Sequence, residues 1–262
     1  MIDVTRPSYA RMYDYLIGGT DNYAADRHAC HELLAIAPAM EQLAQANRAF
    51  LVRAVRYLAR ERGVRRFLDF GAGLPSRPNV HEVAQAVDPA SSVVYIDDDP
   101  MVCAHGRMVL EENLLTTAVV EADIRRLDTI FTVPRVRRLL AADEPVAALF
   151  VSVLHCIDDT DDPWNLVSEV AARLPRGSFI VISHLASDDA TQREDLTNFM
   201  QRTVTTWGRV RSTSEIARLF AQMDLQEHPE PVDVSTWHPD ARPGLHPYAR
   251  DWAEYGGVAQ TR

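Results

Sequence analysis

The chain has 262 residues, of which 47% are hydrophobic and 24% are charged, as is usual for a globular protein. Its formal net charge of −10 argues against a surface for nucleic acid or anionic lipid, because phosphate contacts need clustered cations. All 27 positions that hold lysine or arginine hold arginine, which excludes a Walker-type phosphate loop and a pyridoxal Schiff base, since both chemistries require lysine.

The first predicted elements are helices, which extend from about residue 8 to residue 62. Apolar side chains repeat at helical spacing along the first of them, at Tyr9, Met12, Tyr13 and Leu16. The Gly18-Gly19 pair ends this helix, and Thr20 or Asp21 is placed to cap the next one.

A longer helix is predicted from about Met40 to Arg62, with Gly63 as its stop. Its inward-facing positions are Leu43, Phe50, Leu51, Ala54 and Leu58. Asn47 lies on the same side of the helix, and its buried amide needs a partner, either the backbone or a carboxylate of a bound ligand. We therefore expect residues 1–63 to form an N-terminal helical extension.

From residue 65 onward, short apolar runs alternate with amphipathic helices. The apolar runs cover residues 65–70, 91–97, 117–123, 145–154 and 177–184, and the helices cover 79–87, 100–114, 163–174 and 190–206. Apolar, β-branched strands separated by helices indicate a parallel sheet covered on both faces, and right-handed crossovers then produce a doubly wound sheet. Residues 64–262 are therefore expected to form one Rossmann-like α/β domain.

The C-terminal part is less regular. A helix is expected at 213–221, and a proline-rich loop at 237–247. Segments 224–234 and 251–260, on either side of that loop, have the composition of a terminal antiparallel hairpin.

The candidate ligand site lies at the carboxyl ends of the strands, because ligands of an open α/β sheet bind there. The first strand ends with Asp69, Gly71 and Gly73 in the segment FLDFGAGLPS. The two glycines let the backbone approach a ligand closely. Ser76 replaces the third glycine of a dinucleotide fingerprint, and the prolines in this loop stiffen it, so a pyrophosphate is disfavoured here.

Acidic side chains also end the next two strands. Asp97 stands at the tip of VVYIDDDP, where one carboxylate can accept both hydroxyls of a ribose. Asp99 and Pro100 are expected to cap the following helix. Asp123 ends the third strand, where it can accept from an exocyclic adenine amine while Ile124 packs on the ring. Acids at three successive strand tips, beside two glycines, indicate a nucleoside site.

These motifs resemble those of the class I S-adenosylmethionine-dependent methyltransferases. More closely, the chain resembles an actinobacterial family of uncharacterised S-adenosyl methyltransferases. The family's pattern consists of five motifs: YDYLxGGxDNxxADR, NRAFLxRAVRYL, LDxGxGLPxxxNVHEVAQ, VVYVDxDP and LHxxxDxDDP. In the same order, this chain has YDYLIGGTDNYAADR, NRAFLVRAVRYL, LDFGAGLPSRPNVHEVAQ, VVYIDDDP and LHCIDDTDDP. The resemblance covers nearly the whole chain. It implies a seven-stranded sheet with one antiparallel strand and S-adenosylmethionine as cofactor, and it leaves the methyl acceptor open.

The resemblance also implies which residues contact the cofactor. The methionine and ribose parts would be lined by Asp69, Gly71, Ala72 and Gly73. Asp97 would hold the ribose hydroxyls, and Asp123 would accept from the adenine amine, with Asp98 beside the ring. Ser152 and Leu154, after the fourth strand, would lie near the sulfonium.

His155 follows directly and is the candidate general base, with a packing role for its ring as the alternative. Methyl transfer depends mainly on positioning and needs a base only when the nucleophile is protonated. His184 and His81 are further candidates of the same kind. The acidic run at 158–163 suggests a metal or a helix start, and its Asp162-Pro163 pair favours the helix start, so no metal is expected.

The N-terminal helix is expected to cover the cofactor and exclude water from it. Arg11, Tyr15 and the Gly18-Gly19 turn lie on the face of this helix opposite its apolar residues, at a spacing that suits contact with a ligand. On this hypothesis Arg11 pairs with the methionine carboxylate, and the two glycines allow a close backbone approach.

The sequence favours an S-adenosylmethionine-dependent methyltransferase that acts on an unidentified small molecule. A nicotinamide-dependent oxidoreductase and a non-catalytic S-adenosylmethionine-binding protein stay open as alternatives. No apolar run approaches the roughly 20 residues that span a bilayer, and no signal peptide is recognisable, so a cytoplasmic protein without membrane or nucleic-acid partners is expected. The sequence leaves a homodimer open.

Overall fold

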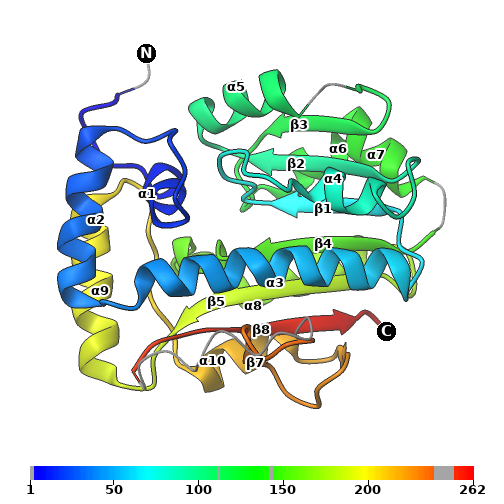
Figure 1. The fold of residues 1–262 in the computed structure, drawn as a ribbon. Helices are drawn as coiled ribbons and strands as arrows, with labels where there is room; N and C mark the ends of the chain where they lie inside the picture. The colour runs from blue at the N-terminus through cyan, green and yellow to red at the C-terminus, as the bar shows by residue number, and fades with distance from the viewer. Residues whose placement is uncertain (1–2, 111–112, 142–143, 239–250) are drawn as a thin grey trace.

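The computed structural model describes residues 3–110, 113–141, 144–238 and 251–262. A mixed sheet forms the centre, and helices cover both of its faces (Figure 1). Five parallel strands make up most of the sheet: β1 Arg66–Phe70, β2 Ser92–Asp97, β3 Thr117–Glu121, β4 Val146–Val151 and β5 Phe179–Ala186. This is the predicted doubly wound, mostly parallel arrangement.

One strand runs against the others. The order in the sheet is β3-β2-β1-β4-β5-β8-β6, and β8, Ala253–Gln260, is antiparallel to β5. The short strands β6, Asp224–Leu225, and β7, Val232–Asp233, each pair with β8. The expected C-terminal hairpin therefore exists, and its two-residue pieces raise the strand number in the described residues to eight. The predicted proline-rich loop lies largely outside the described residues.

Each face of the sheet packs against its own hydrophobic cluster. On one face, the helices α3, Met40–Arg60, and α4, Val80–Gln85, cover the sheet together with the end of α5, Pro100–Val109. On the other face lie α6, Leu127–Thr132, α7, Pro134–Leu140, α8, Pro163–Arg173, and α10, Thr213–Ala217. Burial of both faces explains why the parallel strands are apolar throughout rather than alternating.

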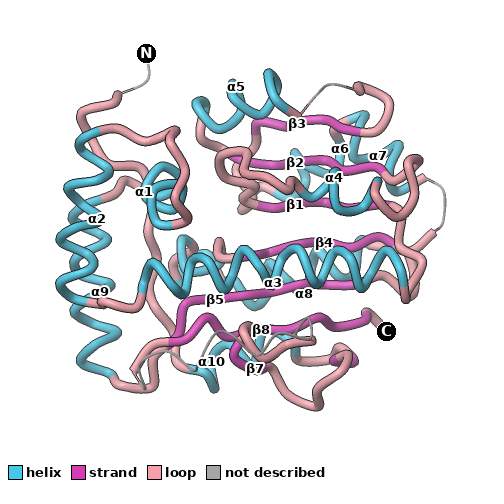
Figure 2. The backbone as a smooth tube through the Cα atoms, viewed as in Figure 1, coloured by secondary structure: helices cyan, strands magenta, loops and turns pink. Residues whose placement is uncertain are grey.

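A third layer of helices stands at the carboxyl ends of the parallel strands. It consists of α1, Tyr9–Leu16, α2, Ala24–Ile36, the first part of α3, and α9, Ala190–Thr203, which share a hydrophobic cluster. Figure 2 shows this layer of helices beside the ends of the strands. In Figure 1 the arrows of the parallel strands point toward it, and that of β8 points away. The first residues of β8 therefore begin where the parallel strands end.

The starts of α5 and α8 follow the capping rules, whereas α1, α3, α6 and α7 begin without a side-chain cap. Asp99 accepts a hydrogen bond from the backbone of Met101 at 2.8 Å, and Asp162 accepts from that of Asn165 at 3.0 Å, as their positions before proline predicted. The cap predicted for α2 is wrong, because α2 begins after Tyr23, whose N–H donates to the Asp26 carboxylate at 2.8 Å. A carboxylate three residues into the helix serves as well as one at the cap.

Several other elements differ from the predictions. The helices α6 and α7 were not predicted, because Pro134 divides their apolar pattern into two short pieces. The α5 helix ends at Val109 rather than near 114, and the helix predicted for 213–221 splits into α10 and a 3₁₀ turn at Arg218–Phe220. The α9 helix ends at Thr203 rather than at 206, which leaves residues 204–206 to line a cavity.

Candidate functional site

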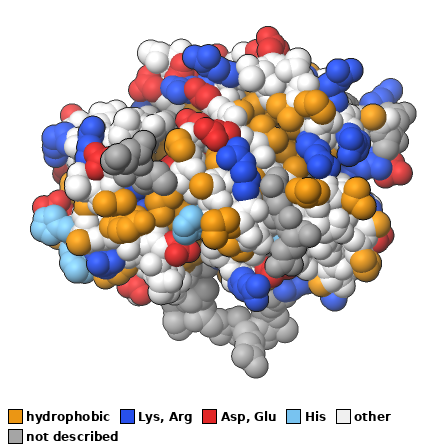
Figure 3. All heavy atoms as spheres, turned by 90° about the horizontal axis from the view of Figure 1, so that it is seen from above, with side chains coloured by type: hydrophobic (Ala, Val, Ile, Leu, Met, Phe, Trp, Pro, Cys, Tyr) orange, Lys and Arg blue, Asp and Glu red, His pale blue; other side chains and the backbone are white. Residues whose placement is uncertain are grey.

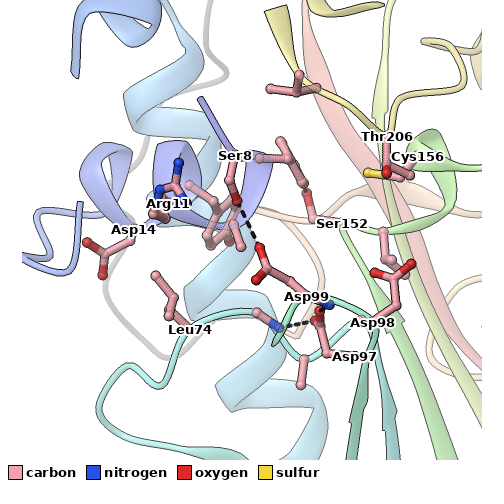
Figure 4. A pocket seen from close by; sticks show the side chains of 18 of the residues that line it. Ser8, Arg11, Asp14, Leu74, Asp97, Asp98, Asp99, Ser152, Cys156 and Thr206 are labelled. Atoms are coloured by element: carbon pink, nitrogen blue, oxygen red, sulfur yellow. Dashed lines mark hydrogen bonds between the residues drawn. The ribbon is translucent and has the colours of Figure 1, made fainter. Parts of the chain in front are cut away.

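A cavity of about 810 Å³ lies between α1 and the carboxyl ends of the parallel strands. Its size falls within the range of small-molecule and cofactor sites. Figure 4 shows the side chains that line it, drawn from α1, from the loops after the strands, and from residues 204–206. Most of the predicted cofactor residues line this one cavity: Arg11, Asp69, Gly71, Ala72, Gly73, Asp97, Asp98, Asp123, Ile124 and Ser152.

The loop after β1 takes its shape from the two glycines. Gly71 has a φ of 72° and Gly73 a φ of 66°, in the left-handed region that other residues adopt at a cost. A Cβ on Gly71 would lie 2.2 Å from Cγ2 of Val153, whereas a Cβ on Gly73 would meet nothing within 4 Å. The first glycine is therefore needed for both conformation and space, and the second for conformation alone.

Asp97 joins this loop to the tip of β2. Its Oδ2 accepts from the Gly73 N–H at 2.9 Å, and its Oδ1 accepts from the Asp99 N–H at 3.0 Å (Figure 4). Each oxygen keeps further acceptor capacity for a ligand. Burial raises the pKa of Asp97 to about 6, against the opposing effect of the two backbone donors. The carboxylate is thus held rigidly and is poorly solvated.

Asp69 is more deeply buried and lies near Asp97. Burial raises the pKa of its carboxyl to about 7, the cationic Arg48 acts in the opposite direction, and the charge of Asp97 raises it further. Two poorly solvated acids in one cavity favour a ligand that carries positive charge, because such a ligand stabilises both carboxylates.

Asp98 and Asp123 are two further acids in the lining of the cavity. Burial and the nearby charge of Asp123 raise the pKa of Asp98. Asp123 itself binds Arg125, with 2.7 Å between Oδ2 and Nη2, and this pairing lowers the pKa of its carboxyl. An adenine amine that reached Asp123 would have to share the carboxylate with this exposed arginine. Ile124 lies beside them, buried.

The α1 helix closes the cavity from the opposite side. The Ser8 hydroxyl, just before α1, donates to Oδ2 of Asp99 at 3.2 Å and so connects α1 to the loop after β2 (Figure 4). Arg11 lines the cavity, but its guanidinium already binds the buried Asp26, with 2.8 Å between Nε and Oδ2.

The other residues predicted on that face of α1 lie away from the cavity lining. The Tyr15 hydroxyl is hydrogen-bonded to His31 Nε2 at 3.1 Å. Gly18 follows the helix end, and a Cβ on Gly19 would overlap the Asp14 carboxylate. Asp14 does line the cavity, where it accepts hydrogen bonds from the Asp21 N–H at 2.8 Å and from the Asn22 amide at 2.9 Å. The Gly-Gly turn thus accommodates Asp14.

His155 is fully buried behind the lining. Its Nε2 lies 2.8 Å from the hydroxyl of Tyr9, which does line the cavity. Burial and the cationic Arg211 lower the pKa of the imidazole to about 3, so the ring is neutral at physiological pH. His184 is also buried and binds Arg211, and His81 lies on α4 with its Nδ1 2.8 Å from the Tyr95 hydroxyl.

Ser152 occupies the tip of β4 in a strained conformation, with a φ of 57°. Its hydroxyl lines the cavity, lies 3.2 Å from the Tyr9 hydroxyl, and donates to Oε1 of Glu254 at 3.2 Å. Glu254 is a buried acid that the sequence analysis did not single out. Its buried position could have been inferred from the sequence, because this acid stands between apolar residues in the segment WAEYGGV.

The Asn47 amide is hydrogen-bonded to two side chains. The sequence had suggested the backbone or a ligand carboxylate as its partner. Its Oδ1 accepts from the Ser183 hydroxyl at 2.5 Å, and its amide donates to the Tyr13 hydroxyl at 2.8 Å. Ser183 in turn accepts from the Ser152 N–H at 3.0 Å, so Asn47 supports the strained tip of β4.

Neither a metal centre nor a membrane span is found in the part of the chain that the structure describes. No group of three or more potential His, Cys, Asp or Glu ligands gathers there. None of its helices combines the length and the apolar character needed to cross a bilayer.

The chain is similar to known proteins over its whole length. The family model described as S-adenosyl methyltransferase matches residues 1–262. A crystal structure from Thermobifida fusca YX, described as that of a proposed methyltransferase, is 34% identical, covers 99% of this chain and 97% of its own, and has a TM-score of 0.89. A DUF574 family protein from Streptomyces avermitilis MA-4680 is 36% identical over 100% of both chains, with a TM-score of 0.91. No curated protein matches significantly.

Proposed function

The chain belongs to the S-adenosyl methyltransferase family, and from that premise we propose that it methylates a small molecule held beneath α1. The protein is an S-adenosylmethionine-dependent methyltransferase, which removes the nicotinamide-dependent oxidoreductase and the non-catalytic binding protein as alternatives.

The cavity fits this cofactor in both charge and shape. When bound, S-adenosylmethionine supplies an electrophilic methyl group on a sulfonium cation. Seven acidic residues and four arginines line the cavity, and the excess of acids favours a cationic ligand. The acids are Asp3, Asp14, Asp69, Asp97, Asp98, Asp99 and Asp123. Gly73 also lines the cavity, and nothing lies within 4 Å of where its Cβ would stand, so a ligand can approach the main chain there.

Each part of the lining suits one part of the cofactor. We assign the ribose hydroxyls to Asp97, whose two oxygens are oriented by backbone donors. Asp98, Asp123 and Ile124 would receive the adenine, and Asp69 with the loop from Gly71 to Gly73 would receive the methionine part. Ser152, at the tip of β4, would lie near the sulfonium. The acids at three adjacent strand tips in one cavity are the observation that carries this assignment.

We propose that α1 is the cover of the site. The side chains that support this role line the cavity along the helix: Tyr9, Arg11, Tyr13, Asp14 and Ile17. Arg11 is already paired with Asp26 of α2. We therefore propose that its main role is to hold α1 against α2, and not to bind the methionine carboxylate. Residues 1–63 then act as the helical cover of the Rossmann-like part, although α3 also packs on the sheet.

A small-molecule acceptor suits the enclosed position beneath α1. The face of the molecule in Figure 3 carries interspersed acidic, basic and hydrophobic side chains, and the net charge of the chain is −10. Neither feature favours a polyanionic acceptor such as nucleic acid.

Calorimetric titration tests the assignment. S-adenosylmethionine and S-adenosylhomocysteine are expected to bind the protein, and NAD is not. Asp97→Asn is expected to weaken both interactions, while Asp195→Asn, an exposed change on α9, leaves them unchanged. Tighter binding of NAD, or full affinity in Asp97→Asn, contradicts the proposed site.

A further inference from the structure

A buried chain of hydroxyl and carboxyl groups leads away from the cavity. Ser152 donates to Glu254 at 3.2 Å, the Tyr9 hydroxyl lies 3.2 Å from the Ser152 hydroxyl, and His155 Nε2 lies 2.8 Å from the Tyr9 hydroxyl. Tyr9 and Ser152 line the cavity, so the chain begins where a ligand can reach it. Glu254 and His155 are its two buried ends.

The topology of the sheet brings Glu254 to this position. β8 is antiparallel to β5, and Glu254 stands opposite Leu185 near the carboxyl end of β5. An acid from the last strand therefore lies behind the tip of β4, with only 4% of its surface exposed. Its second oxygen, Oε2, has no hydrogen-bond partner among the described residues. A buried carboxylate oxygen without a partner is costly and calls for a functional explanation.

We propose that Glu254 takes up, through the Ser152 hydroxyl, the proton that the methyl acceptor loses during transfer. The inference rests on the proposed function, since it requires the acceptor atom to lie against Ser152 or Tyr9. Ser152 is the group that meets the acceptor, and Glu254 acts through it.

The step balances in atoms and charge. The acceptor oxygen or nitrogen bonds to the methyl carbon as the carbon–sulfur bond breaks, and the sulfur keeps that electron pair. The acceptor's proton passes to the Ser152 oxygen while the Ser152 hydroxyl proton passes to Glu254. The positive charge lost at sulfur is matched by the negative charge lost at the Glu254 carboxylate.

The pKa values of the two buried ends decide where the proton stays. Burial raises the pKa of Glu254 to about 8, with the Ser152 hydrogen bond acting against this and the charge of Asp233 adding to it. The pKa of His155 is lowered to about 3, mainly by burial. Glu254 is therefore mostly protonated at neutral pH, and its ionised form, whose share grows as the pH rises through about 8, is the one that takes up the proton. Of the titratable groups that face Glu254, Tyr9 and Tyr13 of α1 stay neutral because burial raises the pKa of each, and Asp233 comes from β7.

This arrangement selects a class of acceptor. A hydroxyl or an amine N–H brings a proton that has to leave, and only such an acceptor needs the chain to Glu254. An acceptor that is already anionic, such as a carboxylate, has no proton to lose and gains nothing from this chain. We therefore assign the acceptor to the hydroxyl- or amine-bearing small molecules.

The first test measures cofactor binding and needs no acceptor. The sulfonium charge of S-adenosylmethionine is expected to interact with ionised Glu254, whereas uncharged sulfur in S-adenosylhomocysteine is not. In the wild type, the affinity ratio of the two ligands should rise on the order of tenfold between about pH 6.5 and pH 9.5. Glu254→Gln, which matches the protonated side chain in shape, should abolish the rise associated with a pKa near 8, and the exposed Glu194→Gln should retain it.

Infrared difference spectra of the free protein supply a second readout. A carboxylic C=O band with a midpoint near pH 8 is expected in the wild type and is expected to be missing in Glu254→Gln. An unchanged band, or a ligand ratio with the same pH dependence in both proteins, overturns the inference. If neither ligand binds the wild type, the proposed function fails instead, so the two failures are distinguishable.

The third test uses cofactor with a tritium-labelled methyl group and a panel of phenols, alcohols, amines and thiols. On hydroxyl or amine acceptors, Glu254→Gln should lower kcat by about 10²-fold and remove the rise of activity with pH. Glu254→Asp should restore part of that rise, and methylation of a thiol, which ionises by itself, should change little. Equal pH profiles of wild type and Glu254→Gln on a hydroxyl or amine acceptor contradict the inference.

Discussion

The Oδ2 atom of Asp97 accepts a hydrogen bond from the backbone N–H of Gly73 at 2.9 Å, so the tip of β2 and the loop after β1 form one unit. This bond explains how a flexible glycine loop keeps a defined shape at the edge of the cavity. It also sets the position of the carboxylate before any ligand arrives, which reduces the ordering that binding requires.

Asp97→Asn is expected to weaken S-adenosylmethionine binding by about 10- to 100-fold, which corresponds to the roughly 1.5–3 kcal/mol of hydrogen bonds to a charged group. The amide keeps the shape of the side chain but cannot accept at both of its ends. Calorimetry at about pH 8, where the wild-type carboxyl with its pKa near 6 is ionised, measures the change. A decrease of less than threefold would show that Asp97 is not a direct ligand.

Alanine substitutions at Gly71 and Gly73 compare the cost of backbone conformation alone with the cost of conformation and lost space. Gly73→Ala should destabilise the protein by about 1–2 kcal/mol, the cost of a left-handed conformation for alanine. Gly71→Ala should cost more, because its Cβ also meets Val153 at 2.2 Å. Urea unfolding of the two variants checks the order. Equal destabilisation would mean that Val153 moves aside at little cost.

Arg11 and Asp26 form an ion pair whose side chains are 4% and 0% exposed. Arg11→Met should lower the free energy of unfolding by about 3–5 kcal/mol, because it leaves the buried Asp26 carboxylate without its opposite charge. The double change Arg11→Met with Asp26→Asn should recover part of that loss. Thermal unfolding measures both.

The same double variant separates the two roles considered for Arg11. If Arg11 only fastens α1 to α2, S-adenosylmethionine binding should stay within about threefold of the wild type in the double variant. A larger loss of affinity, with the stability recovered, would support the earlier hypothesis that Arg11 meets the methionine carboxylate.

The contribution of Asp69 to the stability of the free protein should fall as the pH rises from about 4 to about 7. The pKa of Asp69 is raised from 3.8 to about 7 by burial, so in this range the folded protein binds more protons than the unfolded chain. The slope contributed by this one group is at most about 1.4 kcal/mol per pH unit. Urea unfolding at a series of pH values should show that the stability of the wild type relative to Asp69→Asn falls over this range. A steeper fall in that variant would contradict the assignment.

Much of the fold can be predicted from local patterns. Buried parallel strands are apolar throughout, and amphipathic helices repeat at their own period, so the five parallel strands and α3 are recognisable in the sequence. The caps at Asp99 and Asp162 depend only on neighbouring residues. The glycines and acids at the strand tips follow from the rule that ligands of a parallel sheet bind at its carboxyl edge, and the structure gathers them in one cavity.

The partners of the buried polar groups depend on contacts between distant segments. The periodicity of α1 defines its apolar face, but only the packing of α2 places Asp26 against Arg11. Likewise, Ser152 and Glu254 are 102 residues apart in sequence, and they meet because β8 enters the sheet antiparallel beside β5. By itself the sequence determined the strands, the strand-tip acids and the glycine loop, since these depend on short-range chemistry. The tertiary structure decided which buried charges face one another, because burial and proximity exist only once the chain has folded.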